Sequence, residues 1–200
     1  MSNSGNDRML IMNREFVLAS QSPRRKYLLR QIGLSFTTDP AHIDESVRPG
    51  EAPGDYAVRL ALDKAREVAG RRKTGVIIAA DTIVVVDDTI LGKPADADDA
   101  GRMLGMLSGR MHRVITGVAL LDAGTGKAVS RFAVTNVWFR ELSLGEIAAY
   151  VATGEPMDKA GAYGIQEKGA LLIEKIEGCY ANVVGLPIAL LDTLLREFKI

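Results

Sequence analysis

One segment near the N-terminus constrains this chain more than any other. The apolar run Phe16–Ala19 is followed by two serines, Ser20 and Ser22, and then by Pro23 and the cations of residues 24–26. Serine is a preferred helix N-cap and proline suits the first helical position, so a strand should end and a helix begin here. A helix N-terminus attracts anions, whereas basic side chains in the first turn oppose the helix dipole. The segment therefore predicts an anion site, for which a polyphosphate is a suitable ligand.

Composition limits the class of protein. The 200 residues are 47% hydrophobic and 25% charged, which is ordinary for a globular protein with a sizeable core. A formal net charge of zero argues against a general nucleic-acid or membrane-surface binder. Cys179 is the only cysteine, which excludes a disulfide framework and fits a reducing compartment. No segment is long and apolar enough to span a bilayer. We therefore expect a cytoplasmic protein with no nucleic-acid or membrane partner.

Helical and strand patterns alternate along the chain, and a hairpin is mixed in. Two long β segments, residues 112–121 and 129–140, flank a glycine-containing turn. This mixture predicts an α/β fold with a mixed sheet rather than an all-parallel one. No linker separates two domains, so we expect one domain over residues 15–200, with two lobes around a cleft. A flexible polar extension is expected at residues 1–14.

A carboxylate follows a buried apolar run in the middle of the chain. The run Val76–Ala80 predicts a central strand that Asp81 terminates, and Ile83–Val86 predicts a second strand directly behind it. Ligand sites in open α/β sheets collect at strand ends, so Asp81 is a candidate general base. A turn aspartate that caps Thr82 explains the same pattern. Near the C-terminus, residues 180–184 also predict a strand.

Other polar residues each allow a functional and a structural interpretation. Glu45, beside Asp44 in a proline- and glycine-rich loop, is either a magnesium ligand or a solvated loop carboxylate. Lys64 and Lys93 are either phosphate contacts or surface lysines whose alkyl stems pack on apolar neighbours. Gln166 ends a glycine-spaced loop and can donate and accept at once, which suits the edge of a nucleobase.

Together these pieces resemble one family closely. The chain is similar to the Maf family of nucleoside triphosphate pyrophosphatases, once described as septum formation inhibitors. The resemblance is carried in order by Leu18-Ala-Ser-Gln-Ser-Pro-Arg-Arg25, Ala80-Asp-Thr82, Gly92-Lys-Pro94, Leu107-Ser-Gly109, Asp158-Lys-Ala-Gly-Ala-Tyr-Gly-Ile-Gln166 and Asn182-Val-Val-Gly-Leu-Pro187.

The resemblance implies a fold and a reaction. The fold is like that of inosine triphosphate pyrophosphatases, with an elongated mixed sheet flanked by helices. The reaction is hydrolysis of a nucleoside triphosphate to the monophosphate and diphosphate with a divalent metal, magnesium or manganese. The segment that ends at Gln166 resembles the branch that acts on dTTP and UTP, and modified pyrimidine nucleotides are further candidate substrates. A homodimer is also implied as a possibility.

The resemblance also implies roles for individual residues. Asp81 matches the proton acceptor, and Glu45 matches an acidic position that we interpret as a metal ligand. Base specificity is implied for Arg24, Thr82 and Gln166. Positions that face the phosphates are implied for Ser20, Ser22, Arg25, Lys64 and Lys93.

Two other functions compete with the enzyme. A nucleotide-binding regulator of cell division would bind the same ligand without catalysis. A nucleic-acid binder would use the basic residues of 24–30, but the zero net charge and the few aromatic residues argue against it.

Overall fold

The computed structural model describes residues 14–198, which divide into two compact units. Unit 1 comprises residues 14–81, Thr116–Phe132 and residues 185–198, and unit 2 comprises Thr82–Ile115 and Ala133–Val184. The expected N-terminal extension lies outside the described residues except for Arg14. The single domain over residues 15–200 stays a prediction. Among the described residues, no helix has the length and hydropathy needed to cross a membrane.

The strands form one mixed sheet. Its order is β2-β1-β3-β5-β6-β7, with β4 paired to β3. β1 (Phe16–Leu18) is parallel to both β2 (Thr37–Thr38) and β3 (Val76–Val86). Antiparallel pairs join β4 (Thr89–Leu91) to β3 and β7 (Ile173–Glu177) to β6. The two long strands are β5 (Met111–Asp122) and β6 (Ala128–Phe139). The predicted α/β class with a mixed, helix-flanked sheet is confirmed.

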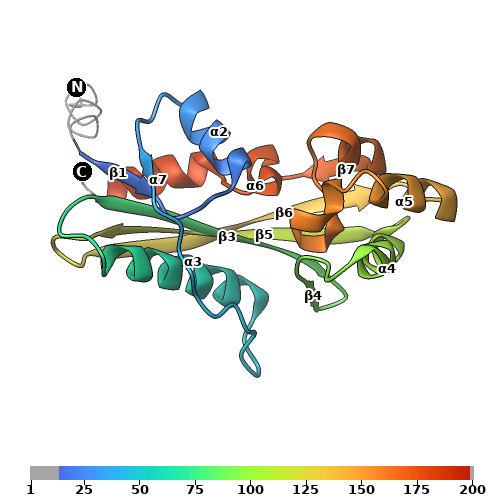
Figure 1. Cartoon of the computed structure of the whole chain (residues 1–200), viewed down its shortest axis with the longest axis horizontal. Helices are drawn as coiled ribbons and strands as arrows, with labels where there is room; N and C mark the ends of the chain where they lie inside the picture. The colour runs from blue at the N-terminus through green and yellow to red at the C-terminus, as the bar shows by residue number, and fades with distance from the viewer. Residues whose placement is uncertain (1–13, 199–200) are drawn as a thin grey trace. The chain divides into compact units, whose positions relative to one another are not determined.

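In unit 1, helices cover the sheet on both faces. The helices are α2 (Pro23–Gln31), α3 (Pro53–Ala69) and α7 (Ile188–Phe198), and Figure 1 shows α3 opposite α2 and α7. Small side chains of α3, such as Ala61 and Ala65, pack on Ile77 and Ala79 of β3. Helix α3 approaches β5 closely at Gly117, a residue without a side chain. A Cβ atom at this position would lie 2.2 Å from the carbonyl oxygen of Ala57.

Helix α2 begins and ends where the sequence predicts. The Ser22 hydroxyl accepts a hydrogen bond from the Arg25 N–H at 3.4 Å, and Pro23 occupies the first turn. Gly33 follows the helix with a φ of 75°, a conformation that glycine adopts without a steric penalty. The basic first turn contains no acidic residue, so no side chain within it complements the helix dipole.

Unit 2 packs two longer helices and a series of short 3-10 turns around its own core. The helices are α4 (Ala97–Leu107) and α5 (Leu144–Val151), and the turns are η1 (Glu155–Asp158), η2 (Ala160–Ala162) and η3 (Glu167–Leu172). A capping box joins Ser143 and Glu146 at the start of α5, as the sequence predicts. In η2, Gly161 has a φ of 67°, and a Cβ atom there would lie 2.8 Å from Val84.

Two strand predictions are wrong. β3 is one continuous strand of 11 residues, so Asp81 lies in its interior and neither ends a strand nor caps a turn. The strand can continue through this carboxylate because Lys64 pairs with it. Residues 180–184 form a short helix, α6 (Tyr180–Val184), instead of a strand. A run of five residues is too short for its periodicity to separate helix from strand.

The α6 helix is fixed by a buried amide. The Asn182 side chain donates hydrogen bonds of 3.0 Å to the Val114 carbonyl and to the Thr135 hydroxyl. The Thr135 hydroxyl in turn accepts a hydrogen bond from the N–H of Cys179 at 3.0 Å. These contacts come from β5 and β6, which are distant in sequence, so no local pattern could reveal them.

Candidate functional site

Strand alternation places Asp81 against helix α3. Residues two apart on a strand share a face, so Asp81 lies on the same side of β3 as Ile77 and Ala79. Those two side chains pack against α3. One turn before Ala65 on that helix stands Ala61, and Lys64 lies between them in sequence. The Asp81 side chain therefore lies on the face of β3 that packs against α3, the helix that carries Lys64.

Lys64 joins two carboxylates. Its Nζ lies 2.5 Å from Oδ1 of Asp81 and 2.6 Å from Oε1 of Glu45. Asp81 is buried and Lys64 is largely so, whereas the Glu45 side chain is 52% exposed. One ammonium group thus pairs with two acidic groups, which the sequence separates by 36 positions. The structure confirms neither catalytic nor metal-binding roles, but it brings these three predicted residues together.

Arg25 is the second cation of this cluster. Its Nε donates to the Gly185 carbonyl at 2.9 Å and its Nη1 donates to the Ser20 hydroxyl at 3.2 Å. Burial lowers the pKa of the Arg25 guanidinium, and the negative charges of Asp81 and Glu45 partly offset that effect. Arg25 therefore shares one electrostatic environment with both carboxylates.

The two serines are organised around the start of α2. The Ser20 hydroxyl accepts the N–H of Ser22 at 3.2 Å in addition to the Arg25 guanidinium. Arg24 is half-buried and adjacent to Arg25 in the helix. Most of the predicted site residues consequently belong to unit 1, namely Ser20, Ser22, Arg24, Arg25, Glu45, Lys64 and Asp81.

The other predicted residues belong to unit 2. Thr82 is the residue after Asp81 on β3. Lys93 is exposed and forms no ion pair with the described part of the chain. The half-buried side chain of Gln166 has no hydrogen-bond partner within residues 14–198. Within the described residues, this lysine and this amide are both available to a ligand.

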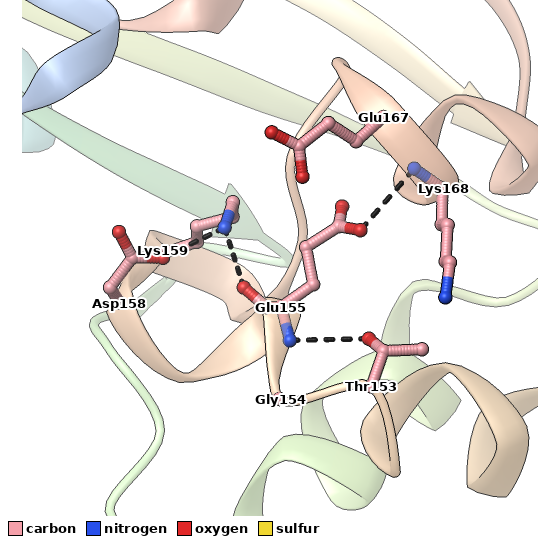
Figure 2. A pocket seen from close by; sticks show the side chains of 7 residues that line it. All are labelled: Thr153, Gly154, Glu155, Asp158, Lys159, Glu167 and Lys168. Carbon is pink, nitrogen blue, oxygen red and sulfur yellow. Dashed lines mark hydrogen bonds and ion pairs between the residues drawn. The ribbon is translucent and has the colours of Figure 1, made fainter.

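A polar pocket lies beside the segment that carries Gln166. Its volume is about 400 Å³, and Figure 2 shows the residues that line it: Thr153, Gly154, Glu155, Asp158, Lys159, Glu167 and Lys168. Glu155 accepts hydrogen bonds from the Tyr150 hydroxyl at 2.8 Å and from the N–H groups of Lys168 and Gly169 at 3.3 and 3.1 Å. The Tyr150 hydroxyl also accepts the N–H of Gly164 at 3.3 Å.

Tyr150 and Glu155 therefore hold the chain on both sides of Gln166. Neither residue could be predicted from the sequence, because each acts on backbone groups that carry no sequence signal of their own. Burial and the neighbouring Glu155 raise the pKa of Tyr150. The hydroxyl is thus a permanent donor to Glu155 at neutral pH.

The donor set near Lys64 fits a metal that binds together with a phosphate. Residues 14–198 contain no group of three or more His, Cys, Asp and Glu side chains that could hold a metal ion. Glu45 and Asp81 nevertheless converge on one ammonium group and supply oxygen ligands. Magnesium commonly binds through one or two carboxylates together with substrate phosphates. Two carboxylates without a third protein ligand fit a metal that arrives with the substrate phosphates. They fit a metal bound permanently by the protein alone less well.

Comparison with known proteins identifies the family. The model of the family described as Maf-like protein matches residues 15–198. The chain belongs to the Maf-like family. Within it, a protein of Acetivibrio thermocellus described as dTTP/UTP pyrophosphatase is 51% identical over 193 residues, covering 93% of this chain and 96% of that protein. A protein of Syntrophotalea carbinolica with the same description is 55% identical over 183 residues, covering 90% and 83% of the two chains.

A solved structure supports the fold of this Maf-like chain. The Ham1 protein of Staphylococcus aureus matches with a TM-score of 0.51 at 15% identity, covering 92% of this chain and 100% of that one. At this identity the likeness concerns the fold alone. The expected α/β fold with a mixed sheet is supported by this match.

Proposed function

We propose that this Maf-like protein is a nucleoside triphosphate pyrophosphatase that hydrolyses dTTP and UTP to the monophosphate and diphosphate. Modified pyrimidine triphosphates are further candidate substrates. The proposal is supported by the description shared by relatives that are 51% and 55% identical. The single observation that carries it is the placement of Asp81 and Glu45 on the ammonium group of Lys64.

In the proposed reaction, water attacks the α-phosphorus. A bond forms between that phosphorus and the water oxygen, the bond to the bridging oxygen breaks, and diphosphate leaves. Asp81 accepts the proton that the water loses, a role that typically contributes about 10²–10⁴-fold to rate. Asp81 is buried, and its Oδ1 lies 2.5 Å from Nζ of Lys64, so the carboxylate that would accept the proton is held in one place.

The cations stabilise the phosphate charge. Arg25, Lys64 and Lys93, with the hydroxyls of Ser20 and Ser22, are proposed to bind the phosphates. Preorganised donors of this kind stabilise charge as it develops on a leaving diphosphate. Arg24, Thr82 and Gln166 are proposed to select the base. Gln166 suits that task because its amide has no partner within the described residues.

A divalent metal, magnesium or manganese, is proposed as the cofactor. Glu45 would hold it together with Asp81 and the substrate phosphates. When bound, the metal supplies positive charge that neutralises phosphate oxygens and polarises the reacting phosphoryl group. We further propose a cytoplasmic location, which the single cysteine supports, and a homodimer, which the family resemblance supports.

The proposal is tested by diphosphate release from a panel of canonical and modified nucleoside triphosphates with magnesium or manganese. We expect release from dTTP and UTP, with the monophosphate as co-product. Nucleotide binding without release from any member of the panel would instead favour the regulator that acts in cell division without catalysis.

A further inference from the structure

Glu45 is carried by a segment without regular structure. Residues 39–52 contain neither helix nor strand, and the Glu45 side chain is half exposed. Ion pairs of exposed side chains contribute little by themselves, because water screens them and side-chain entropy opposes them. One contact of a half-exposed carboxylate therefore contributes little to fixing the whole segment.

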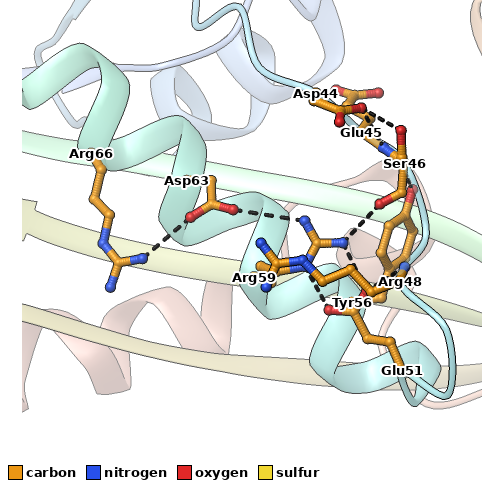
Figure 3. A network of polar contacts seen from close by, with 9 residues as sticks. All are labelled: Asp44, Glu45, Ser46, Arg48, Glu51, Tyr56, Arg59, Asp63 and Arg66. Carbon is orange, nitrogen blue, oxygen red and sulfur yellow. Dashed lines mark hydrogen bonds and ion pairs between the residues drawn. The ribbon is translucent and has the colours of Figure 1, made fainter.

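The first turns of α3 hold two consecutive backbone carbonyl groups of the segment. The Tyr56 hydroxyl donates to the Glu45 carbonyl at 2.6 Å. Nη2 of Arg59 donates to the Ser46 carbonyl at 2.9 Å. Tyr56 and Arg59 are three apart on the helix, so both lie on one face of it. Figure 3 shows both side chains directed from α3 toward the segment.

Arg59 also binds the far end of the segment. Its Nε and Nη2 lie 2.6 and 2.7 Å from the two carboxylate oxygens of Glu51, a bidentate pair. The Arg59 and Glu51 side chains are only 14% and 11% exposed, and the guanidinium lies 5.4 Å from the Tyr56 ring centroid. Oε2 of Glu51 accepts the N–H of Arg48 at 3.2 Å.

The pairing of Arg59 with Glu51 favours the charged form of both side chains. The hydrogen bond to Arg59 lowers the pKa of Glu51, and the same bond raises the pKa of Arg59. Bidentate arginine–carboxylate pairs are among the stronger and more directional hydrogen bonds in proteins. Arg59 thus closes residues 46–51 into a loop, and Glu45 projects from its edge toward Lys64.

We propose that Arg59 is a positioning residue that holds Glu45 against Lys64 and Asp81, so that a metal–nucleotide complex meets two carboxylates already in place. This inference rests on the proposed function, because it assigns a metal to Glu45. Arg59 itself contacts neither phosphate nor metal in this assignment. Its effect passes through Ser46, Glu51 and the loop they belong to.

The test compares Arg59→Met with a matched variant of the same helix. Arg66→Met is the control, because its 64% exposed side chain pairs only with Asp63 among the described residues, 3.2 Å away and on the helix itself. We expect Arg59→Met to raise the manganese concentration for half-maximal UTP hydrolysis about tenfold, with kcat at saturating manganese little changed. Arg59→Lys keeps the charge but loses the bidentate geometry, and we expect it to recover only part of the loss.

Two readouts do not depend on turnover. Calorimetric binding of manganese to the complex with a non-hydrolysable α,β-imido UTP should weaken by the same factor in Arg59→Met. Hydrogen exchange of the peptide that spans residues 43–51 should accelerate in Arg59→Met and not in Arg66→Met. Equal behaviour of the two variants in these measurements would overturn the inference.

Glu45→Gln separates this inference from the proposed function. If Glu45→Gln weakens manganese binding and Arg59→Met does not, the metal assignment stands and the positioning role is wrong. If both variants leave manganese binding unchanged, the metal assignment itself is wrong. A loop that exchanges faster in Arg59→Met while binding stays unchanged would show that Arg59 orders the loop without serving the site, which also overturns the proposal.

Discussion

Nζ of Lys64 lies 2.5 Å from Oδ1 of Asp81, and this contact joins helix α3 to the middle of strand β3. A carboxylate in the interior of a buried strand is costly unless a charge or hydrogen bond satisfies it. Lys64 supplies that charge from the neighbouring layer. The strand can therefore carry a carboxyl group at a point where an uninterrupted apolar strand would offer no chemistry.

Replacing the Asp81 carboxylate should separate catalysis from binding. We expect Asp81→Asn to lower kcat for UTP by about 10²–10⁴-fold, because the amide cannot accept the proton of the attacking water. Binding of α,β-imido UTP in the absence of divalent metal, measured by calorimetry, should change little. Asp192→Asn is the control, since Asp192 is exposed on α7 and pairs with Arg196. Undiminished turnover in Asp81→Asn would refute the assigned base.

The start of α2 could be predicted because its signals are local. Ser22, Pro23 and Gly33 each act on the backbone within a few residues, and the helix begins and ends accordingly. The interior position of Asp81 could not be predicted in the same way. It depends on Lys64, which is 17 residues away in sequence and in another layer.

A second local signal was overlooked. Asp87 and Asp88 have φ values of 44° and 62° and connect β3 to β4 in a tight hairpin. Aspartate is one of the few non-glycine residues that tolerate this region, so an Asp-Asp pair between apolar runs was a usable turn signal. By contrast, Tyr56, Arg59 and Glu155 act on loop backbone, and nothing in their sequence neighbourhood marks them. Candidate chemical groups can therefore be chosen from the sequence, whereas the residues that position them cannot.

Gln166 should discriminate between bases. We expect Gln166→Ala to lower kcat/KM for UTP and dTTP by roughly tenfold to hundredfold, as for one or two lost hydrogen bonds. A purine triphosphate should lose much less, because it does not use the same contacts. Parallel assays of UTP and GTP hydrolysis measure the ratio, with Gln31→Ala of the exposed α2 terminus as the control. Equal losses for both nucleotides would show that Gln166 does not contact the base.

The Tyr150 hydroxyl should affect substrate affinity through the Gln166 segment. Tyr150→Phe removes the donor to Glu155 and the acceptor for Gly164, with little change in packing volume. We expect KM for UTP to rise several-fold while kcat changes little, and stability to fall by about 1 kcal/mol. Tyr180→Phe, at an exposed position, is the control. A fall in kcat at unchanged KM would contradict a role in holding this segment.

His112 should make folding stability depend on pH. It is buried in unit 2, with Nε2 2.7 Å from the Tyr163 hydroxyl, edge-to-face contacts to the Tyr163 and Phe139 rings, and no hydrogen-bond partner for Nδ1 in the described chain. Burial lowers the pKa of His112 to about 4, from 6.5 when unfolded.

Because the unfolded chain binds the proton more readily, the free energy of unfolding should decrease as pH falls from 6.5 toward 4. Protonation of His112 in the unfolded chain lowers the free energy of unfolding by about 3 kcal/mol over that interval. Above pH 6.5 the imidazole is neutral in both states, and this loss of stability is absent. Urea unfolding at pH 7 and pH 4.5 measures the total loss of free energy of unfolding, to which the titration of carboxylates also contributes. His112→Gln keeps a partner for Tyr163 but cannot be protonated, so its loss over the same interval should be smaller by most of that amount. If the wild type and His112→Gln lose equal stability between these pH values, the imidazole is not the group that titrates.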